Sequence, residues 1–283
     1  MKILCEEEVP LLDLLKKWFP ESSNNTLRSW LEKERVFVQG KVVRLANQLV
    51  KKGERVEVGP KVQFLRGDIR LLYEDAHIAV VVKPEGLLSV ATDFDNQCAH
   101  AILKRHANGM VYPVQRLDRD TSGVMVFTYT QSARKGLQAQ FKEHTVERAY
   151  MAIVEGVLSE KKGAWKSYLV EDADYFMHSG ASPEQGKFSV THYEVISERR
   201  SHSLVRFRLE TGRKNQIRVH SSEAGHPIAG DEKYGAKTNP AKRLCLHAYQ
   251  LGFIHPENNK KMQFNIPLPD SFTSHFPHVQ IKK

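Results

Sequence analysis

The sequence contains few cysteines, no long apolar run and fewer acidic than basic side chains. Cys5, Cys98 and Cys245 are an odd number with no close pair, so neither a disulfide framework nor a cysteine zinc knuckle is indicated. The apolar runs are too short for a membrane span, and the N-terminus lacks the basic-then-apolar pattern of a secretory signal. Together these absences favour a protein of the reducing cytoplasm.

Metal, nucleotide-hydrolase and serine-hydrolase sites are also disfavoured. His220, His226, Cys245 and His247 follow no familiar zinc-ligand spacing, and packed or solvent-facing histidines explain them better. Residues 225–230 begin like a phosphate-binding loop, but Asp-Glu follows where Lys-Ser/Thr would be needed. The segment T-S-G lacks the leading glycine of a nucleophile elbow. Of the kinds of catalytic site considered, carboxylate chemistry without a metal is the one that the sequence still allows.

Composition indicates a globular protein with a polyanionic partner. The 283 residues suffice for one large domain or two, with 41% hydrophobic and 27% charged residues. The 42 Lys and Arg outnumber the 33 Asp and Glu, which gives a net charge of +9. This surplus does not by itself separate a nucleic acid from an anionic membrane surface as the partner.

Residues 1–60 predict a small module of two helices followed by a basic β element. Apolar residues recur at helical spacing over 11–19, and residues 22–25 offer several N-caps for a second helix. Residues 36–43 have the pattern of a hairpin with glycine at its turn, and 55–58 alternate like a strand.

Residues 61–67 are the predicted linker, and 68–283 are the predicted main domain. Its expected strands lie within 71–73, 78–82, 124–127, 148–155, 187–196, 203–210, 244–248 and 262–266. Its expected helices lie near 99–106, 132–141 with Ser132 as the cap, and 217–224. Many strands with few helices between them predict an α+β fold whose sheet is mixed and largely antiparallel, with flanking helices.

Residues 112–128 read Y-P-V-Q-R-L-D-R-D-T-S-G-V-M-V-F-T and form the centre of the chain. The apolar run at 124–127 suits a buried strand, and the six residues before it are nearly all turn formers. A charged loop tied to a buried strand is a rigid place to hold a reactive carboxylate. Local chemistry alone, however, favours mere turn-capping roles for Asp118 and Asp120.

Residues 116–123 resemble the catalytic signature H-R-L-D-x-x-T-S-G of the RluA-type pseudouridine synthases. Three further segments match that family in order: K-P-E-G-L at 83–87, R-A-Y-M-A-I-V-E-G at 148–156, and G-R-K-N-Q-I-R-V-H at 212–220, which leads into G-H-P-I-A-G-D. The resemblance spans about residues 68–270, and four ordered motifs are far more specific than one. Gln115 and Asn215 depart from it, because each stands where the family generally has His.

The resemblance implies an isomerase that converts uridine to pseudouridine in structured RNA, with no cofactor and no metal. It makes Asp118 the catalytic carboxylate, places Tyr150 against a flipped uracil and pairs Arg218 with Asp118. By composition alone, a strand Tyr is usually core and a lone Arg is usually in a surface ion pair. The resemblance also implies that Arg116 holds RNA and that Leu246 is an apolar wall of the pocket, for which ordinary core is the alternative. The basic side chains of Lys83 and Arg213 are expected to bind RNA phosphates.

Residues 1–60 resemble the RNA-binding module first known from ribosomal small-subunit protein four. Its basic residues would then face RNA phosphates; they are Arg28, Lys33, Arg35, Lys41, Lys51 and Lys52. The alternative for these side chains is an ordinary solvated basic surface.

Large-subunit ribosomal RNA is the first expectation for the target, and transfer RNA is the second. The expected protein is a cytoplasmic monomer that binds RNA and no membrane. Two other functions share these features: a non-catalytic RNA-binding ribosome-assembly factor, and a nucleoside hydrolase acting through Asp118 and Asp120. Whether the carboxylate would attack the base or the sugar stays open.

Overall fold

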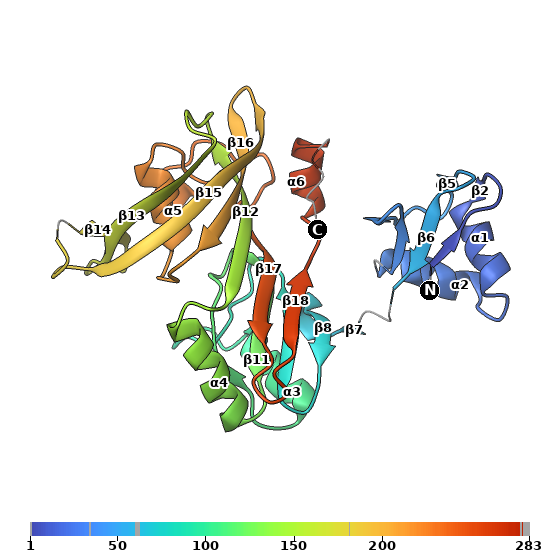
Figure 1. Cartoon of the computed structure of the whole chain (residues 1–283), viewed down its shortest axis with the longest axis horizontal. Helices are drawn as coiled ribbons and strands as arrows, with labels where there is room; N and C mark the ends of the chain where they lie inside the picture. Colours follow the sequence, from blue (N-terminus) through green and yellow to red (C-terminus); the bar gives the residue numbers. More distant parts are fainter. Residues whose placement is uncertain (1, 34, 60–62, 181, 278, 280–283) are drawn as a thin grey trace. The chain divides into compact units, whose positions relative to one another are not determined.

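The computed structural model describes residues 2–33, 35–59, 63–180, 182–277 and 279. The chain forms two compact units, Met1–Phe64 and Leu65–Lys283 (Figure 1). The boundary between them falls within residues 61–67. None of the helices in the described part of the chain is long and apolar enough to cross a membrane. Cys5, Cys98 and Cys245 are buried and unpaired.

The N-terminal unit combines two helices with two small sheets. Ser23 Oγ accepts a hydrogen bond from Thr26 N at 3.1 Å and so caps the second helix. Gln39 and Gly40 both have positive φ, as a two-residue hairpin turn requires. The helices are α1 (Leu11–Trp18) and α2 (Asn24–Glu32). The larger sheet has the strand order β1 (Lys2–Leu4), β6 (Arg55–Val58), β3 (Val36–Val38), β4 (Lys41–Val42). The second sheet is the pair β2 (Val9–Pro10) and β5 (Leu49–Val50). The expected helices and hairpin are therefore present.

The large unit is built on one long sheet (Figure 1). Its strand order is β14 (Met177–Gly180), β13 (Lys162–Glu171), β15 (Lys187–Arg199), β16 (His202–Leu209), β12 (Glu147–Glu155), β17 (Leu246–Ile254), β11 (Ser122–Thr128), β9 (Ile78–Lys83), β8 (Arg70–Glu74). In addition, β10 (Tyr112–Pro113) pairs with β11, and β18 (Lys261–Asn265) pairs with β17. Among the named strands that the structure describes, only β11 and β17 pair in parallel. The predicted α+β fold with a largely antiparallel sheet is confirmed.

Four helices accompany this sheet: α3 (Ala99–Ala107), α4 (Gln131–Lys142), α5 (Gln216–Glu223) and α6 (Asp270–His275). The 3₁₀ turns η1 (Arg66–Asp68) and η2 (Glu232–Tyr234) complete the large unit, whereas β7 (Gln63–Phe64) belongs to the end of the N-terminal unit. Helix α5 packs against β13, β14 and β15 (Figure 1). Helix α4 begins earlier than predicted, because Thr130 Oγ1 rather than Ser132 accepts the capping hydrogen bond, from Ala133 N at 3.2 Å.

Strands β13 and β14 were not predicted from the sequence. Most residues of β13 are exposed or half-buried, so this outer strand lacks the apolar alternation by which a half-buried strand is recognised. Strand β11 shows the opposite pattern, because all seven of its residues are buried. The buried strand predicted at 124–127 is thus confirmed.

The parallel contact between β11 and β17 brings two backbones unusually close. Ser122 pairs with His247 and Gly123 with Ala248, while Tyr150 of β12 pairs with Ala248 from the other side. Gly123 has φ +131°, and a Cβ atom there would lie 2.3 Å from the Ala248 carbonyl oxygen. Only glycine fits this position. Gly123 is the second residue of β11, directly after the loop that carries Asp118. This contact therefore fixes the end of the loop against the centre of the sheet.

We expect Gly123→Ala to lower the free energy of unfolding by about 3 kcal/mol, because the added methyl group overlaps backbone atoms in a conformation that alanine resists. Gly109→Ala is the matched control, since its nearest contact would be an ordinary 3.6 Å. Urea unfolding followed by circular dichroism measures both losses. A Gly123→Ala protein as stable as Gly109→Ala would contradict the close contact.

Candidate active site

The loop that carries Asp118 is held on both sides. Ser89 Oγ donates to Leu117 O at 2.7 Å and lies 3.0 Å from Leu117 N, which donates to it. Thr121 N donates to Asp118 O at 3.2 Å and closes the turn. Buried polar atoms of Gln115 (Nε2) and Thr121 (Oγ1) find no hydrogen-bond partner in the described part of the chain.

Lys83, at the end of β9, also fixes this loop, whereas it was predicted to bind the substrate. Its side chain is fully buried, with 0% exposed, and Nζ donates to the carbonyl oxygens of Pro84, Leu87 and Arg119 at 2.7–2.8 Å. Burial lowers the pKa of Lys83 to about 7, although the negative charge of nearby Asp118 opposes the shift. Its three donors are already used, so Lys83 anchors the loop and does not reach an RNA phosphate.

Asp118 lies opposite the guanidinium group of Arg218. Asp118 Oδ2 is 3.6 Å from Arg218 Nη1, with 32% of the Asp118 side chain and 12% of the Arg218 side chain exposed. Burial raises the pKa of the Asp118 carboxyl above its ordinary value of 3.8, whereas the charge and hydrogen bonding of Arg218 lower it. The structure thus brings the two predicted partners together, 100 residues apart in sequence.

Arg218 is itself held by a second carboxylate, Asp231. Arg218 Nε and Nη2 each donate to one oxygen of Asp231 at 2.7 Å, and Asp231 is 2% exposed. Asn215 Oδ1 accepts from Arg218 Nη1 at 3.3 Å, and the Tyr234 ring lies 4.8 Å beneath the guanidinium carbon. Burial lowers the pKa of Arg218, but hydrogen bonding to Asp231 together with the charges of Asp231 and Asp118 outweighs this effect, so the net shift is upward. The guanidinium stays charged and fixed.

The roles of Asp231 and Asn215 were not predicted from the sequence. Asn215 begins α5 with φ +53°, a conformation that Asn tolerates better than most residues. Its Nδ2 donates to Tyr234 Oη at 2.9 Å. The only signal in the sequence was the segment G-H-P-I-A-G-D, which ends in Asp231. The sequence does not show that Asp231 pairs with Arg218, because a bidentate ion pair depends on the geometry of the fold.

Tyr150 lies on β12, beside the close contact of β11 and β17. Its side chain is buried, and burial raises the pKa of the phenol to about 12. Arg148 lowers this pKa and Asp118 raises it, so the phenol is within electrostatic range of the Asp118 carboxylate. The strand pairing changes register between Ala149 and Tyr150, and this bulge sets the direction of the Tyr150 side chain.

A second polar cluster joins two of the motifs through Arg243 and His247 and was not predicted. Arg243 Nη2 donates to Ser122 Oγ at 2.7 Å, and Ser122 Oγ lies 2.6 Å from His247 Nδ1. Arg243 also pairs with Glu85. Burial, and then the charge of Arg243, lower the pKa of His247 to about 3, so His247 is neutral and accepts from Ser122. The cluster ties the K-P-E-G-L loop to the end of the Asp118 loop.

The other predicted substrate-binding residues lie in different surroundings. Arg116 and Arg213 are exposed, as residues that contact RNA must be. Arg213 Nε donates to Phe188 O at 3.3 Å. Leu246 is buried in the core with 3% exposed, directly before His247 on β17.

The N-terminal basic residues are also placed differently from one another. Arg35 differs from its prediction, because Nε and Nη2 both donate to Gly59 O at 3.2 Å and its guanidinium stacks 4.6 Å from the Trp30 ring. The side chain of Lys41 lies outside those that the structure describes. The exposed members of the set are Arg28, Lys33, Lys51 and Lys52.

The arrangement combines a carboxylate, a guanidinium and a neutral phenol in a partly buried site. Within the described ranges, no three His, Cys, Asp or Glu residues are grouped so that they could hold a metal ion. The carboxylate can act as a nucleophile, the guanidinium favours its ionised form and orients it, and the phenol offers a flat ring and one hydroxyl.

Comparison with known proteins gives consistent matches. A family model described as RNA pseudouridylate synthase matches residues 77–223, which include Asp118, Tyr150 and Arg218. Ribosomal large subunit pseudouridine synthase D of Zymomonas mobilis is 36% identical over 232 residues, covering 75% of this chain and 73% of that protein. Its namesake in Haemophilus influenzae is 32% identical over 284 residues, covering 91% and 87%. The solved structure of human RNA pseudouridylate synthase domain containing 4 is similar with a TM-score of 0.61 and 26% identity, covering 74% and 91%.

We expect Asp231→Ala to lower the free energy of unfolding by about 3–5 kcal/mol, because it leaves a buried guanidinium without its bidentate partner. The control is Glu171→Ala, which removes a carboxylate from an exposed pair with Lys214 and should cost about 1 kcal/mol or less. Urea unfolding near neutral pH gives both values. Equal losses in the two variants would show that Asp231 is not the anchor of Arg218.

Proposed function

Since the chain belongs to the RNA pseudouridylate synthase family, whose members isomerise uridine to pseudouridine in RNA, we propose that its own substrate is large-subunit ribosomal RNA. Two observations support this target. Relatives named ribosomal large subunit pseudouridine synthase D align over most of their length at 32–36% identity. The net charge of +9 suits a polyanion. We place the activity in the cytoplasm, where three unpaired cysteines stay reduced.

The observation that carries the mechanism is the contact between Asp118 and Arg218, which is beside the buried Tyr150. Pseudouridine formation breaks the bond from the sugar C1′ to uracil N1 and makes a bond from C1′ to C5. The base must detach, turn and reattach within a closed site. We assign Asp118 as the carboxylate that assists this exchange, either by adding to the uracil ring or by acting at C1′.

Arg218 keeps Asp118 ionised, because a cation beside a carboxylate lowers its pKa and opposes the effect of burial. Two of the Arg218 nitrogens are already committed to Asp231, so only Nη1 faces Asp118. At 3.6 Å this contact orients the Asp118 carboxylate without binding it in a tight bidentate pair. Asp118 therefore keeps an oxygen for the substrate.

Tyr150 would lie against the extruded uracil. Its pKa of about 12 keeps the phenol protonated at neutral pH, so it acts as a flat neutral ring with one hydroxyl. Stacking of a base on such a ring contributes about 1–3 kcal/mol, which offsets part of the few kcal/mol that base flipping costs. We assign the hydroxyl to the late removal of the proton from C5: the phenol gives up its own proton as it takes the C5 proton, and the base gains a proton at N1, so the isomerisation has no net proton change.

The N-terminal unit would add contacts to RNA at a distance from the chemistry. Arg28, Lys33, Lys51 and Lys52 are exposed and free to meet phosphates. Such contacts supply affinity and register without reading the sequence. Arg35 is half-buried and partly engaged with Gly59 and Trp30, so it has fewer donors to offer a phosphate than the four exposed residues.

Asp118→Asn should abolish pseudouridine formation and leave RNA binding intact, because it removes the reacting charge at constant size. Asp120→Asn is the matched control: Asp120 is exposed in the same loop and should be dispensable. Cells that lack the protein and express each variant would be analysed by pseudouridine mapping of ribosomal and transfer RNA. In vitro, filter binding gives the affinity of each variant for RNA.

Activity retained in Asp118→Asn would contradict the catalytic assignment. Pseudouridines that depend on the protein only in transfer RNA would overturn the ribosomal target and leave the chemistry standing. Release of free uracil would indicate a hydrolase.

The pH profile should have its acid limb above pH 3.8. Asp118 acts as a carboxylate, so activity is present above its pKa and is lost as the pH falls through that value. Burial raises this pKa above 3.8. Arg218→Gln should move the limb to still higher pH, because it removes the cation that opposes the shift. Measurement of kcat/KM against pH reports this group in the free enzyme. An acid limb that stays in place in Arg218→Gln would contradict the pairing.

A further inference from the structure

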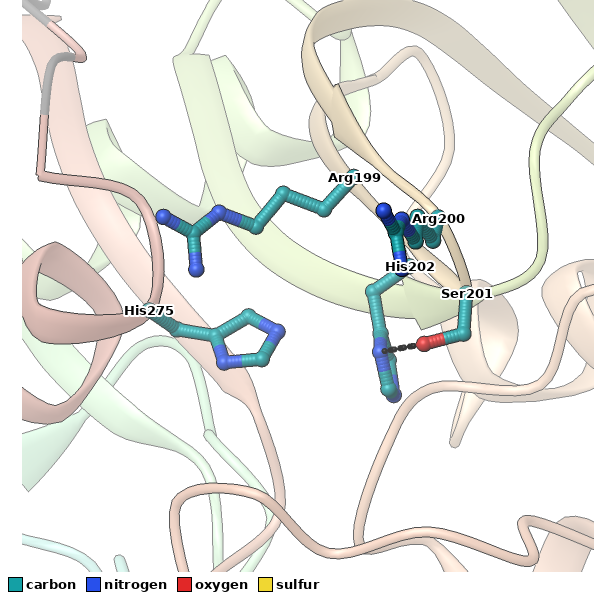
Figure 2. Close-up of a pocket in the computed structure, with 5 residues that line it drawn as sticks. All are labelled: Arg199, Arg200, Ser201, His202 and His275. Atoms are coloured by element: carbon teal, nitrogen blue, oxygen red, sulfur yellow. Dashed lines mark hydrogen bonds between the residues drawn. The ribbon is translucent and has the colours of Figure 1, made fainter.

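A basic pocket lies in the large unit, away from the residues assigned to the chemistry. It has a volume of about 450 Å³ and is lined by Arg199, Arg200, Ser201, His202 and His275 (Figure 2). The first four residues form the turn between β15 and β16. His275 ends α6, and its ring points towards His202 and Ser201 in Figure 2. We call these five residues the turn pocket.

The turn pocket carries two arginine charges that no ion pair with a described carboxylate neutralises. Arg199 and Arg200 are exposed, and neither forms an ion pair with any carboxylate that the structure describes. Glu198, directly before them, is engaged by Lys161 at 2.6 Å. Two guanidinium groups with no anion beside them are the typical composition of a phosphate site.

His275 and His202 form the polar wall of the turn pocket. Their rings meet edge to face with centroids 5.1 Å apart. His202 Nδ1 is 3.0 Å from Ser201 Oγ, and Nε2 is 2.8 Å from Thr238 Oγ1, so its orientation is fixed. His275 Nε2 has no hydrogen-bond partner among the described residues. Burial, and then the charges of His202 and Arg199, lower the pKa of His275, and an anion in the pocket would relieve this effect.

The turn pocket and the Asp118 site are connected through one loop. Thr238, which bonds His202, also accepts at its carbonyl oxygen from Gly230 N at 2.7 Å. Gly230 directly precedes Asp231, the anchor of Arg218. The carboxylate behind this wall, Glu155, accepts from Lys237 N, Thr238 N and Thr238 Oγ1. Glu155 therefore holds the loop, and its charge acts on His202 behind the wall without forming an ion pair with Arg199 or Arg200 in the described part of the chain.

We propose that the turn pocket binds a backbone phosphate of the RNA whose uridine is modified. This inference rests on the proposed RNA substrate. Arg199 and Arg200 would bind the phosphate oxygens, and His275 Nε2 would hydrogen-bond the same group. A phosphodiester at this point would hold the RNA at a second place, outside the Asp118 site, without reading its sequence. The pocket thus contributes to affinity and not to the chemical step.

The test uses the full chain and two probes, an oligouridylate and inorganic phosphate. The double variant Arg199→Gln, Arg200→Gln removes the two guanidinium groups, and Arg105→Gln on α3 removes one exposed arginine elsewhere as the control. Fluorescence anisotropy at several salt concentrations gives the slope of log K against log salt. For oligouridylate we expect this negative slope to become shallower by about 0.7 for each phosphate contact that the double variant loses. The slope should stay unchanged in Arg105→Gln.

Two further readouts make the result specific. The kcat of the double variant at saturating ribosomal RNA should equal that of the wild type, because the chemistry is untouched. In NMR spectra of the wild type, the His275 ring signals should move on addition of oligouridylate.

An unchanged slope in the double variant would overturn the proposal. So would movement of the His275 signals with inorganic phosphate but not with oligouridylate, which would indicate a site for free phosphate. Failure of the proposed function would give a different result. If the wild-type protein makes no pseudouridine in ribosomal RNA, the proposed target is wrong, whatever the salt dependence of binding shows.

Discussion

The site depends on one buried guanidinium that is shared unequally between two carboxylates. Asp231 binds Arg218 through two hydrogen bonds of 2.7 Å and so compensates the cost of burying its charge. Asp118 receives only the remaining nitrogen, at 3.6 Å. Had Asp118 been the tight partner, both its oxygens would be occupied. The unequal sharing orients the Asp118 carboxylate beside a cation without engaging both of its oxygens.

A second constraint is the close approach of backbones where β11 meets β17. Gly123 allows this approach, and the polar cluster of Ser122, His247 and Arg243 surrounds it. From the other side, Lys83 binds the carbonyl of Arg119. The loop between these anchors therefore has little freedom, which is what a positioned carboxylate needs. Motifs far apart in sequence serve mainly to fix one short loop.

The basic residues divide into structural and exposed groups. Lys83, Arg35 and Arg243 spend their donors on carbonyl groups, a hydroxyl or a carboxylate inside the protein. Arg199 and Arg200 remain exposed without a described carboxylate partner. Charge counted from a sequence treats these residues alike. The exposed residues are the ones that can neutralise RNA phosphates, because an N–H group that is hydrogen-bonded within the fold cannot also donate to a phosphate.

The sequence by itself determined the α+β class, the buried strand at 124–127, the N-terminal helices and the family, because these follow from local periodicity, capping and ordered motifs. It did not reveal β13, whose residues are mostly exposed. Nor did it reveal the anchoring of Arg218 by Asp231 or the burial of Lys83. Those features were decided by the tertiary structure, because hydrogen bonding and desolvation depend on which distant groups the fold brings within about 3 Å of each other.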